Sequence, residues 1–327
     1  MDHGCFFIHR NSSSDRDMTL RQIHEFTLSL PDPFDFALTV AKPAGWHWST
    51  PREIFADGIL WSGMYFQDIP VGLKLSAEGT TVTVAVYGES PLDQDLVEEL
   101  TSQVWSALGG DEDLPGFYRF ARDDPILAAV TDHLNGMRVG MARDLFGDVI
   151  LAILLQMAPM SRSDRMMNAV LEHYGKTIIF DGREVILWPR AEEIARVDPG
   201  ELREKTKIGY RAERLVQAAR FLVDHPILQT DLSSLTEEEA IRRLTEIPGV
   251  GPYSAGIILG TFPIDVWSVV IFSELFFGMT PEHPRDAIDE VVSVLTERWG
   301  TWRWFAFVYV VHDLPYLKET YHLSRVT

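Results

Sequence analysis

LTEIPGVGPYSAGIILGTFPIDVWSVVIFSELFFG, residues 244–278, is the stretch of the sequence that decides the fold. Leu244 and Ile247 close an apolar helix, and residues 248–251 (PGVG) then make a tight turn in which glycine can adopt a positive φ. Pro252 suits the first position of a following helix. The pattern predicts two helices joined by a four-residue turn, with unpaired N–H groups directed at an anion such as a phosphate.

An aspartate stands shortly after this turn. Asp265 follows a proline-containing break, Phe262-Pro263-Ile264, and precedes an apolar helix that we expect over residues 266–277. Aspartate is a good N-cap, because its side chain accepts hydrogen bonds from the free N–H groups of the first helical turn. The sequence therefore predicts a carboxylate held near a phosphate-binding turn.

Several motifs in this order resemble those of the helix-hairpin-helix DNA glycosylases, the superfamily of the 3-methyladenine and 8-oxoguanine enzymes. The PGVG turn and the Pro-Ile-Asp at 263–265 are similar to the hairpin and the catalytic aspartate of that superfamily. Further motifs resemble family segments at ILLQ (153–156), GYRA (209–212) and RWGTWR (298–303). The resemblance covers residues 120–327 well and residues 31–120 weakly. It implies an α+β fold, with an N-terminal antiparallel sheet domain followed by a mostly α-helical helix-hairpin-helix glycosylase domain.

The resemblance gives Asp265 the catalytic role. Cleavage of an N-glycosidic bond builds positive charge on the sugar, and a fixed carboxylate stabilises that charge and helps to orient a water. The alternative is a plain N-cap, and the two roles are compatible. One departure stands out, since the stretch between Gly251 and Asp265 is several residues shorter than the family pattern.

Tyr253 and Trp267 are expected at the substrate. Tyr253 stands where the bifunctional members of the family carry a lysine that attacks the sugar, and tyrosine cannot form a Schiff base. The chain therefore resembles the monofunctional members, which leave an abasic site. An aromatic side chain here is also suited to stacking on an extruded base, unless it merely lines the helix. Trp267, Trp46, Trp48 and Trp61 are further candidates for a base pocket, although most tryptophans are core residues.

Contacts with DNA are expected from the hairpin and its surroundings. The backbone of Gly249, Val250 and Gly251 should bind phosphate, and Arg211 and Lys207 are candidates to reach phosphate as well. By the resemblance, Gln156 fills the gap left by a flipped base or touches the opposite base, and the segment Met157-Ala158-Pro159-Met160 after it is suited to an apolar wedge. Gln156 as a plain helix-end cap is the alternative. Family hairpins also often carry a monovalent cation on backbone carbonyls.

The length, net charge and cysteine count of the chain limit its possible partners and cofactors. The chain has 327 residues, a net charge of −19 and one cysteine, Cys5. One cysteine excludes an internal disulfide and a cysteine-ligated iron–sulfur cluster, and scattered histidines argue against zinc. No uninterrupted apolar run is long enough for a membrane span. We expect a cytoplasmic monomer that binds double-stranded DNA with a damaged base, although the net acidity argues against DNA binding.

The order of elements predicts two domains. Residues 1–18 read as a disordered or loosely attached tail, residues 19–112 as an α+β domain, and residues 113–327 as the helical domain. Alternating apolar and polar residues predict strands over residues 25–30, 34–40, 58–63, 71–75 and 80–87. An amphipathic pattern predicts a helix over residues 93–108. Residues 176–187 read as a small β-hairpin inserted among helices.

The leading hypothesis is a monofunctional DNA glycosylase of base excision repair that removes an alkylated purine such as 3-methyladenine. The GYRA segment favours an oxidised purine instead, and the tyrosine also occurs in members that act on uracil or thymine opposite guanine. Two alternatives belong to other functional classes. One is a damage-binding protein without catalysis, which the net acidity and the short spacer favour. The other is a protein-interaction scaffold that has kept the fold.

Overall fold

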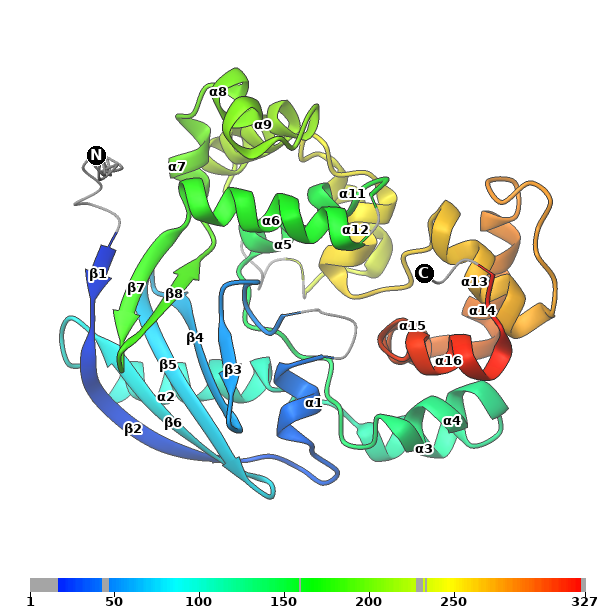
Figure 1. Cartoon of the computed structure of the whole chain (residues 1–327), viewed down its shortest axis with the longest axis horizontal. Helices are drawn as coiled ribbons and strands as arrows, with labels where there is room; N and C mark the ends of the chain where they lie inside the picture. The colour runs from blue at the N-terminus through cyan, green and yellow to red at the C-terminus, as the bar shows by residue number, and fades with distance from the viewer. Residues whose placement is uncertain (1–16, 43–46, 159, 228–231, 233, 325–327) are drawn as a thin grey trace, which may run out of the picture.

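The computed structural model describes residues 17–42, 47–158, 160–227, 232 and 234–324. A β-sheet occupies one side of the molecule, and helices occupy the other (Figure 1). The expected α+β class, with an N-terminal antiparallel sheet and a mostly helical remainder, is confirmed. None of the helices in the described part of the chain is long and apolar enough to cross a membrane.

The main sheet has five antiparallel strands in the order β2-β6-β5-β4-β3. Their bounds are Arg21–Ser29 (β2), Ile54–Ala56 (β3), Ile59–Phe66 (β4), Ile69–Glu78 (β5) and Thr81–Gly88 (β6). Two-residue turns fix the register, because Asp57-Gly58 and Gln67-Asp68 both have positive φ at each position, as tight hairpins require. In β6 the apolar alternation seen in the sequence packs Val82, Val84 and Val86 into the core.

The two faces of this sheet are covered differently. Helix α2 (Gln94–Ala107) packs on one face through Leu100 and Val104. The opposite face receives a three-stranded sheet of β1 (Asp17–Thr19), β7 (Lys176–Phe180) and β8 (Arg183–Leu187). Gly63 and Gly72 are cross-strand partners beneath it, and a Cβ on either would meet Ile178 or Phe180 at 2.7 Å. Glycine at both positions therefore allows the β7–β8 hairpin to lie directly on the sheet.

Three sequence expectations fall in this region. The strand predicted over residues 34–40 is wrong, because the chain forms helix α1 (Phe36–Val40), which Asp35 caps by accepting from the Leu38 N–H at 2.8 Å. Of the predicted tail, residues 1–16 lie outside the described residues, while Asp17 and Met18 belong to β1 and pair with β7. The β-hairpin expected at residues 176–187 is confirmed.

The helices pack around two separate hydrophobic clusters. One contains the helix-hairpin-helix pair and consists of α5 (Leu145–Leu155), α6 (Met160–Tyr174), α7 (Ala191–Ala195), α8 (Pro199–Thr206), α9 (Arg211–Asp224), α11 (Glu237–Thr245) and α12 (Pro252–Leu259). The other joins early helices to the C-terminal ones and consists of α3 (Leu114–Ala121), α4 (Pro125–His133), α13 (Val266–Phe277), α14 (Ile288–Trp299), η1 (Gly300–Trp302), α15 (Arg303–His312) and α16 (Leu314–Tyr321).

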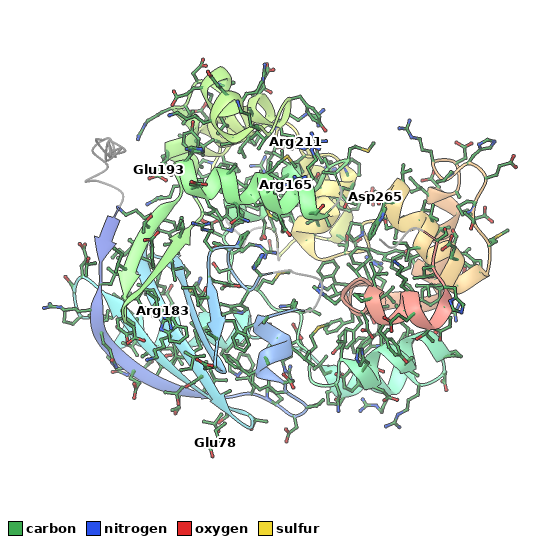
Figure 2. The ribbon with its side chains drawn as sticks, viewed as in Figure 1. Glu78, Arg165, Arg183, Glu193, Arg211 and Asp265 are labelled. Atoms are coloured by element: carbon green, nitrogen blue, oxygen red, sulfur yellow. The ribbon has the colours of Figure 1, made fainter. Side chains whose placement is uncertain are left out.

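The chain passes from the first cluster to the second along residues 260–265. Helix α12 ends at Leu259, where Gly260 adopts a left-handed conformation and the N–H of Thr261 returns to the carbonyl of Gly256. Phe262 and Ile264 then bury in the second cluster. This crossing places Asp265, the residue that follows, at the junction between the two groups of helices (Figures 1 and 2).

Candidate active site

The hairpin between α11 and α12 has one position that only glycine fits. Gly249 has a φ of +85°, and a Cβ there would meet the Cβ of Arg214 at 2.9 Å. Gly251 differs from the expectation, because its φ is −99° and nothing lies within 4 Å of a Cβ at that position. Val250 between them is buried and donates its N–H to the carbonyl of Ile247. The hairpin is thus fixed at Gly249 and open at Gly251.

Helix α12 begins without a side-chain cap. Gly251 is its N-cap residue, Pro252 follows at the first position, and no side chain bonds to the first turn. The N–H groups of Tyr253 and Ser254 belong to this turn, where a helix leaves its donors unsatisfied. Together with the positive end of the helix dipole, they suit an anion.

Asp265 is held by one of its two carboxylate oxygens. Its Oδ1 accepts from the Trp267 N–H at 3.0 Å, the Ser268 N–H at 2.8 Å and the Ser268 hydroxyl at 2.8 Å. Its own N–H donates to the Ser268 hydroxyl at 2.8 Å. The predicted N-cap is confirmed. Asp265 as a residue is half-buried, and within the described part of the chain its Oδ2 makes no hydrogen bond, so this oxygen is available to a ligand.

Tyr253 lies close to Asp265. Burial and then the negative charge of Asp265 raise the pKa of the Tyr253 phenol, so the hydroxyl stays protonated. The ring is half-buried against the first cluster. Trp267 stands two residues after Asp265, with 47% of its surface exposed. The structure therefore brings Tyr253 close to Asp265 and leaves Trp267 exposed on the helix that Asp265 caps, while their roles at a substrate stay predictions.

The other tryptophan candidates are placed elsewhere. Trp48 is fully buried and donates its indole N–H to the carbonyl of Ala107 at 2.8 Å, and Trp61 lies beneath the β7–β8 hairpin. Both are core residues. Trp46 lies outside the described residues.

Gln156 ties the end of α5 to the hairpin. Its amide N–H₂ donates to the carbonyl of Gly249 at 2.8 Å and to the Ser254 hydroxyl at 2.9 Å, and its amide oxygen accepts from Arg214 at 2.7 Å. The side chain is thus engaged with protein groups. In this arrangement it supports the hairpin, and a contact with a base would require these bonds to break.

Arg211 lies in the interior, contrary to the expectation of a surface phosphate ligand. Its side chain is 2% exposed and donates to the carbonyl of Gln156. Burial and then the charges of Arg162 and Arg214 lower its pKa, while Tyr210 acts in the opposite sense. Arg211 therefore positions the turn after α5. Lys207 is exposed in a left-handed conformation at the end of α8 and stays a candidate.

The structure adds exposed groups around this turn. Met157 is 68% exposed with a φ of +49°. Tyr210 is 47% exposed, and its ring lies between the guanidinium groups of Arg211 and Arg214, at 4.7 and 4.6 Å from the ring centroid. Arg162, Arg165 and Arg214 are exposed on α6 and α9. Figure 2 labels Arg165 on α6 and Arg211 on α9. The charges of Arg162 and Arg214 both act on Arg211, so these arginines form a local positive patch despite the net charge of the chain.

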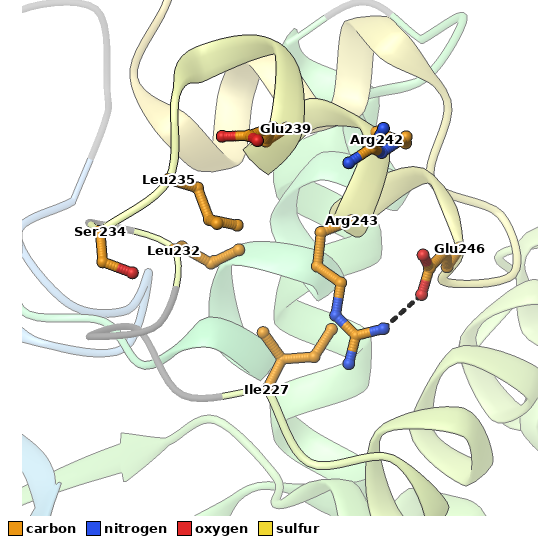
Figure 3. A pocket seen from close by; sticks show the side chains of 8 residues that line it. All are labelled: Ile227, Leu232, Ser234, Leu235, Glu239, Arg242, Arg243 and Glu246. Carbon is orange, nitrogen blue, oxygen red and sulfur yellow. Dashed lines mark hydrogen bonds and ion pairs between the residues drawn. The ribbon is translucent and has the colours of Figure 1, made fainter.

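A separate cavity of about 360 Å³ lies against α11, the first helix of the hairpin pair (Figure 3). Ile227, Leu232 and Leu235 contribute apolar surface to it. Its charges balance, since Arg242 and Arg243 face Glu239 and Glu246, and Arg243 forms an ion pair with Glu246. No lining residue belongs to the group around Asp265.

Metal ligands are not grouped in the described residues, where no three His, Cys, Asp or Glu side chains come together. The monovalent cation expected at the hairpin stays a prediction. The carbonyls of Ile247 and Gly249 each accept one protein hydrogen bond, which leaves each oxygen a second lone pair.

The fold of this chain, which carries a capped aspartate behind a glycine hairpin, is similar to that of solved DNA glycosylases. The 3-methyladenine DNA glycosylase from Archaeoglobus fulgidus superposes with a TM-score of 0.72 at 18% identity, covering 89% of this chain and 99% of that chain. An 8-oxoguanine glycosylase/lyase of Clostridium acetobutylicum, in complex with DNA containing cytosine opposite 8-oxoguanine, gives 0.68 at 18% identity, covering 88% and 92%.

Sequence relatives point the same way. The DNA-3-methyladenine glycosylase of Bacillus subtilis is 25% identical over 227 residues, which are 67% of this chain and 74% of that protein. A probable N-glycosylase/DNA lyase of Methanothermobacter thermautotrophicus is 24% identical over 270 residues, 75% of this chain and 84% of that protein. No family model matches the chain. The homologues and structural neighbours are thus 3-methyladenine and 8-oxoguanine DNA glycosylases of the helix-hairpin-helix type.

Proposed function

We propose that the protein is a monofunctional DNA glycosylase that flips a damaged purine, preferably an alkylated one such as 3-methyladenine, out of duplex DNA and hydrolyses its glycosidic bond. The observation that carries the proposal is the orientation of Asp265. Three donors hold Oδ1, while Oδ2 stays available beside Tyr253 and just behind the hairpin. The names of the sequence relatives, both glycosylases, support it.

In the proposed reaction the bond between C1′ and the base nitrogen breaks, and its electron pair leaves with the base. The sugar carries positive charge as the bond lengthens, and the Asp265 carboxylate lowers the energy of that charge. The oxygen of a water then bonds to C1′, and the released proton passes through Asp265 to solvent or to the departing base. The products are the free base and an abasic site.

An alkylated purine suits these residues. Such a base carries a positive charge and leaves as a neutral molecule, so its departure needs little acid catalysis. Tyr253 and Trp267 offer aromatic surface on which a flipped base can stack. Neither α12 nor α13 contains a lysine, which favours attack by water over a Schiff base. The relative from Bacillus subtilis is named for this base.

The hairpin and the positive patch are the proposed DNA contacts. The backbone of Gly249, Val250 and Gly251 would hold a phosphate at the start of α12, where open space surrounds Gly251. Arg214 and Lys207 would add charge on the same side. Met157, exposed at a turn that Gln156 ties to the hairpin, is placed to fill the gap left by the flipped base.

An 8-oxoguanine glycosylase is the second candidate. The Gly-Tyr-Arg-Ala segment at residues 209–212 favours it, because Tyr210 and the arginines around it form an exposed group next to Gln156. One relative is named a probable N-glycosylase/DNA lyase, so strand cleavage belongs among the measured outcomes.

The test uses labelled duplexes with one lesion each: an alkylated purine, 8-oxoguanine, uracil opposite guanine and thymine opposite guanine. Half of each sample is treated with alkali, and Asp265→Asn runs alongside. We expect product from the alkylated duplex, visible after alkali and lost in the variant. Cleavage without alkali would refute the monofunctional assignment, and preferred release of 8-oxoguanine would favour the second candidate. DNA binding with no release from any duplex would leave a damage-binding protein.

A further inference from the structure

Ser268 makes two hydrogen bonds to Asp265 that an ordinary helix cap lacks. The Asp265 N–H donates to the Ser268 hydroxyl, and the same hydroxyl donates to Oδ1, each at 2.8 Å. A hydroxyl has one proton and two lone pairs, so it can serve both bonds at once. In a capping box the third helical residue normally only accepts from the N-cap N–H. Here it also returns a donor to the cap carboxylate.

The surroundings keep this pair intact. Ser268 is 4% exposed, and it lies among Val269, Val270 and Ile264 in the second hydrophobic cluster. Water therefore does not compete for its hydroxyl, and hydrogen bonds to an ionised group are the strong ones in such a setting. The two backbone donors, Trp267 N–H and Ser268 N–H, would remain without the hydroxyl. The hydroxyl is thus the one side-chain contribution to the orientation of Asp265 among the described residues.

We infer that Ser268 is the positioning residue that saturates Oδ1 of Asp265, so that Oδ2 is directed at the sugar. With Oδ1 engaged by three donors, rotation of the carboxylate would break three bonds. The free oxygen is therefore held in one direction while the base departs. This inference rests on the proposed function, since it assigns Ser268 to the same reaction.

Three variants of Ser268 separate positioning from packing. Ser268→Ala removes both bonds, Ser268→Cys keeps the volume with a weak donor, and Ser268→Thr keeps the hydroxyl. Ser273→Ala is the matched control, because Ser273 is also buried on α13, at 2% exposure, away from Asp265. The measurements are single-turnover base release from the best duplex across pH 5–9, the Kd for that duplex and the melting temperature.

We expect Ser268→Ala and Ser268→Cys to lower the rate by about 10- to 100-fold, the size of one hydrogen bond to a charged group. The Kd should stay within twofold. Ser268→Thr should recover most of the rate, and Ser273→Ala should match the wild type. In a purely structural role the rate would follow the melting temperature and not the presence of the hydroxyl.

Two results would overturn the inference and are distinguishable. An active wild type with an unchanged rate in Ser268→Ala and Ser268→Cys, or with an equal loss in Ser273→Ala, would refute the positioning role alone. A folded wild type that binds DNA and releases no base would refute the proposed function, and the role of Ser268 with it.

Discussion

The exchange of Asp265 for asparagine removes the charge and leaves the cap. The oxygen of asparagine can accept the same three donors that Oδ1 accepts, and its N–H₂ takes the place of the free Oδ2. Asparagine and aspartate are similar as N-caps, so we expect stability to change by less than about 1 kcal/mol. Asp265→Ala, by contrast, loses the cap and should destabilise the fold by about 1–2 kcal/mol.

The effect on the rate follows from the lost charge. A carboxylate about 4 Å from a unit positive charge contributes roughly 4 kcal/mol at an effective dielectric constant of about 20. Removal of that attraction corresponds to a fall of about 1000-fold in the rate of base release. The Kd for lesion DNA should change little, because a negative charge near phosphates does not assist binding.

Single-turnover release from a 3-methyladenine duplex, thermal melting and fluorescence anisotropy measure the three quantities. Asp265→Asn should be slow, stable and able to bind DNA, and Asp265→Ala should be slow and less stable. A rate for Asp265→Asn within threefold of the wild type, in protein that melts normally, would contradict the catalytic role and leave Asp265 as a cap.

Three further predictions follow from other parts of the structure. Tyr253→Lys should gain strand cleavage without alkali and become trapped on DNA by borohydride, because the new amine would lie near Asp265. If no trapped product forms, residue 253 does not lie at the sugar. Gly249→Ala should lower the free energy of unfolding by about 2 kcal/mol, because residue 249 has a φ of +85° and a Cβ there would clash with Arg214. Gly251→Ala should melt normally and bind DNA more weakly. Equal melting temperatures for the two variants would refute the assignment of strain to Gly249. Burial raises the pKa of Glu53 and that of Glu112 from 4.5 to about 7, so the folded chain keeps protons that the unfolded chain loses. Their contribution to stability should therefore fall as pH rises from 5 to 8, and Glu53→Gln should reduce this fall. A melting temperature with the same pH dependence in Glu53→Gln as in the wild type would contradict it.

The hairpin, the cap and the strands could be predicted because nearby residues determine them. Gly249 needs its positive φ, Asp265 caps the residues just after it, and β6 alternates apolar and polar side chains. Helix α1 could not be predicted from its local sequence pattern. A five-residue segment has no decisive period, and its outcome depends on the cap at Asp35 and on the burial of Phe36 and Val40 in the sheet core.

The failure at Arg211 has a different cause. The sequence shows a charged residue in a basic segment, and a surface position is the natural expectation. In the fold, Arg211 turns inward to a carbonyl 55 residues earlier in the chain, and its exposed neighbour Arg214 takes the position beside the hairpin. The helical period is the local pattern that distinguishes the two arginines, because it places residues 211, 215 and 218 on the buried face of α9.

The short spacer before Asp265 follows from how the two helical clusters meet. Pro263 packs on Gly256, where a Cβ would come within 3.3 Å, and Gly260 fits against Trp304 at a similar distance. The chain can therefore turn at once from α12 to α13 and still carry Asp265 back beside Tyr253, near the start of α12. Because Phe262 and Ile264 are buried in the second cluster while Tyr253 packs on the first, the carboxylate is fixed relative to the hairpin by both cores. The spacer is thus shortened by close packing of the crossing, which leaves Asp265 at the hairpin that we propose binds phosphate.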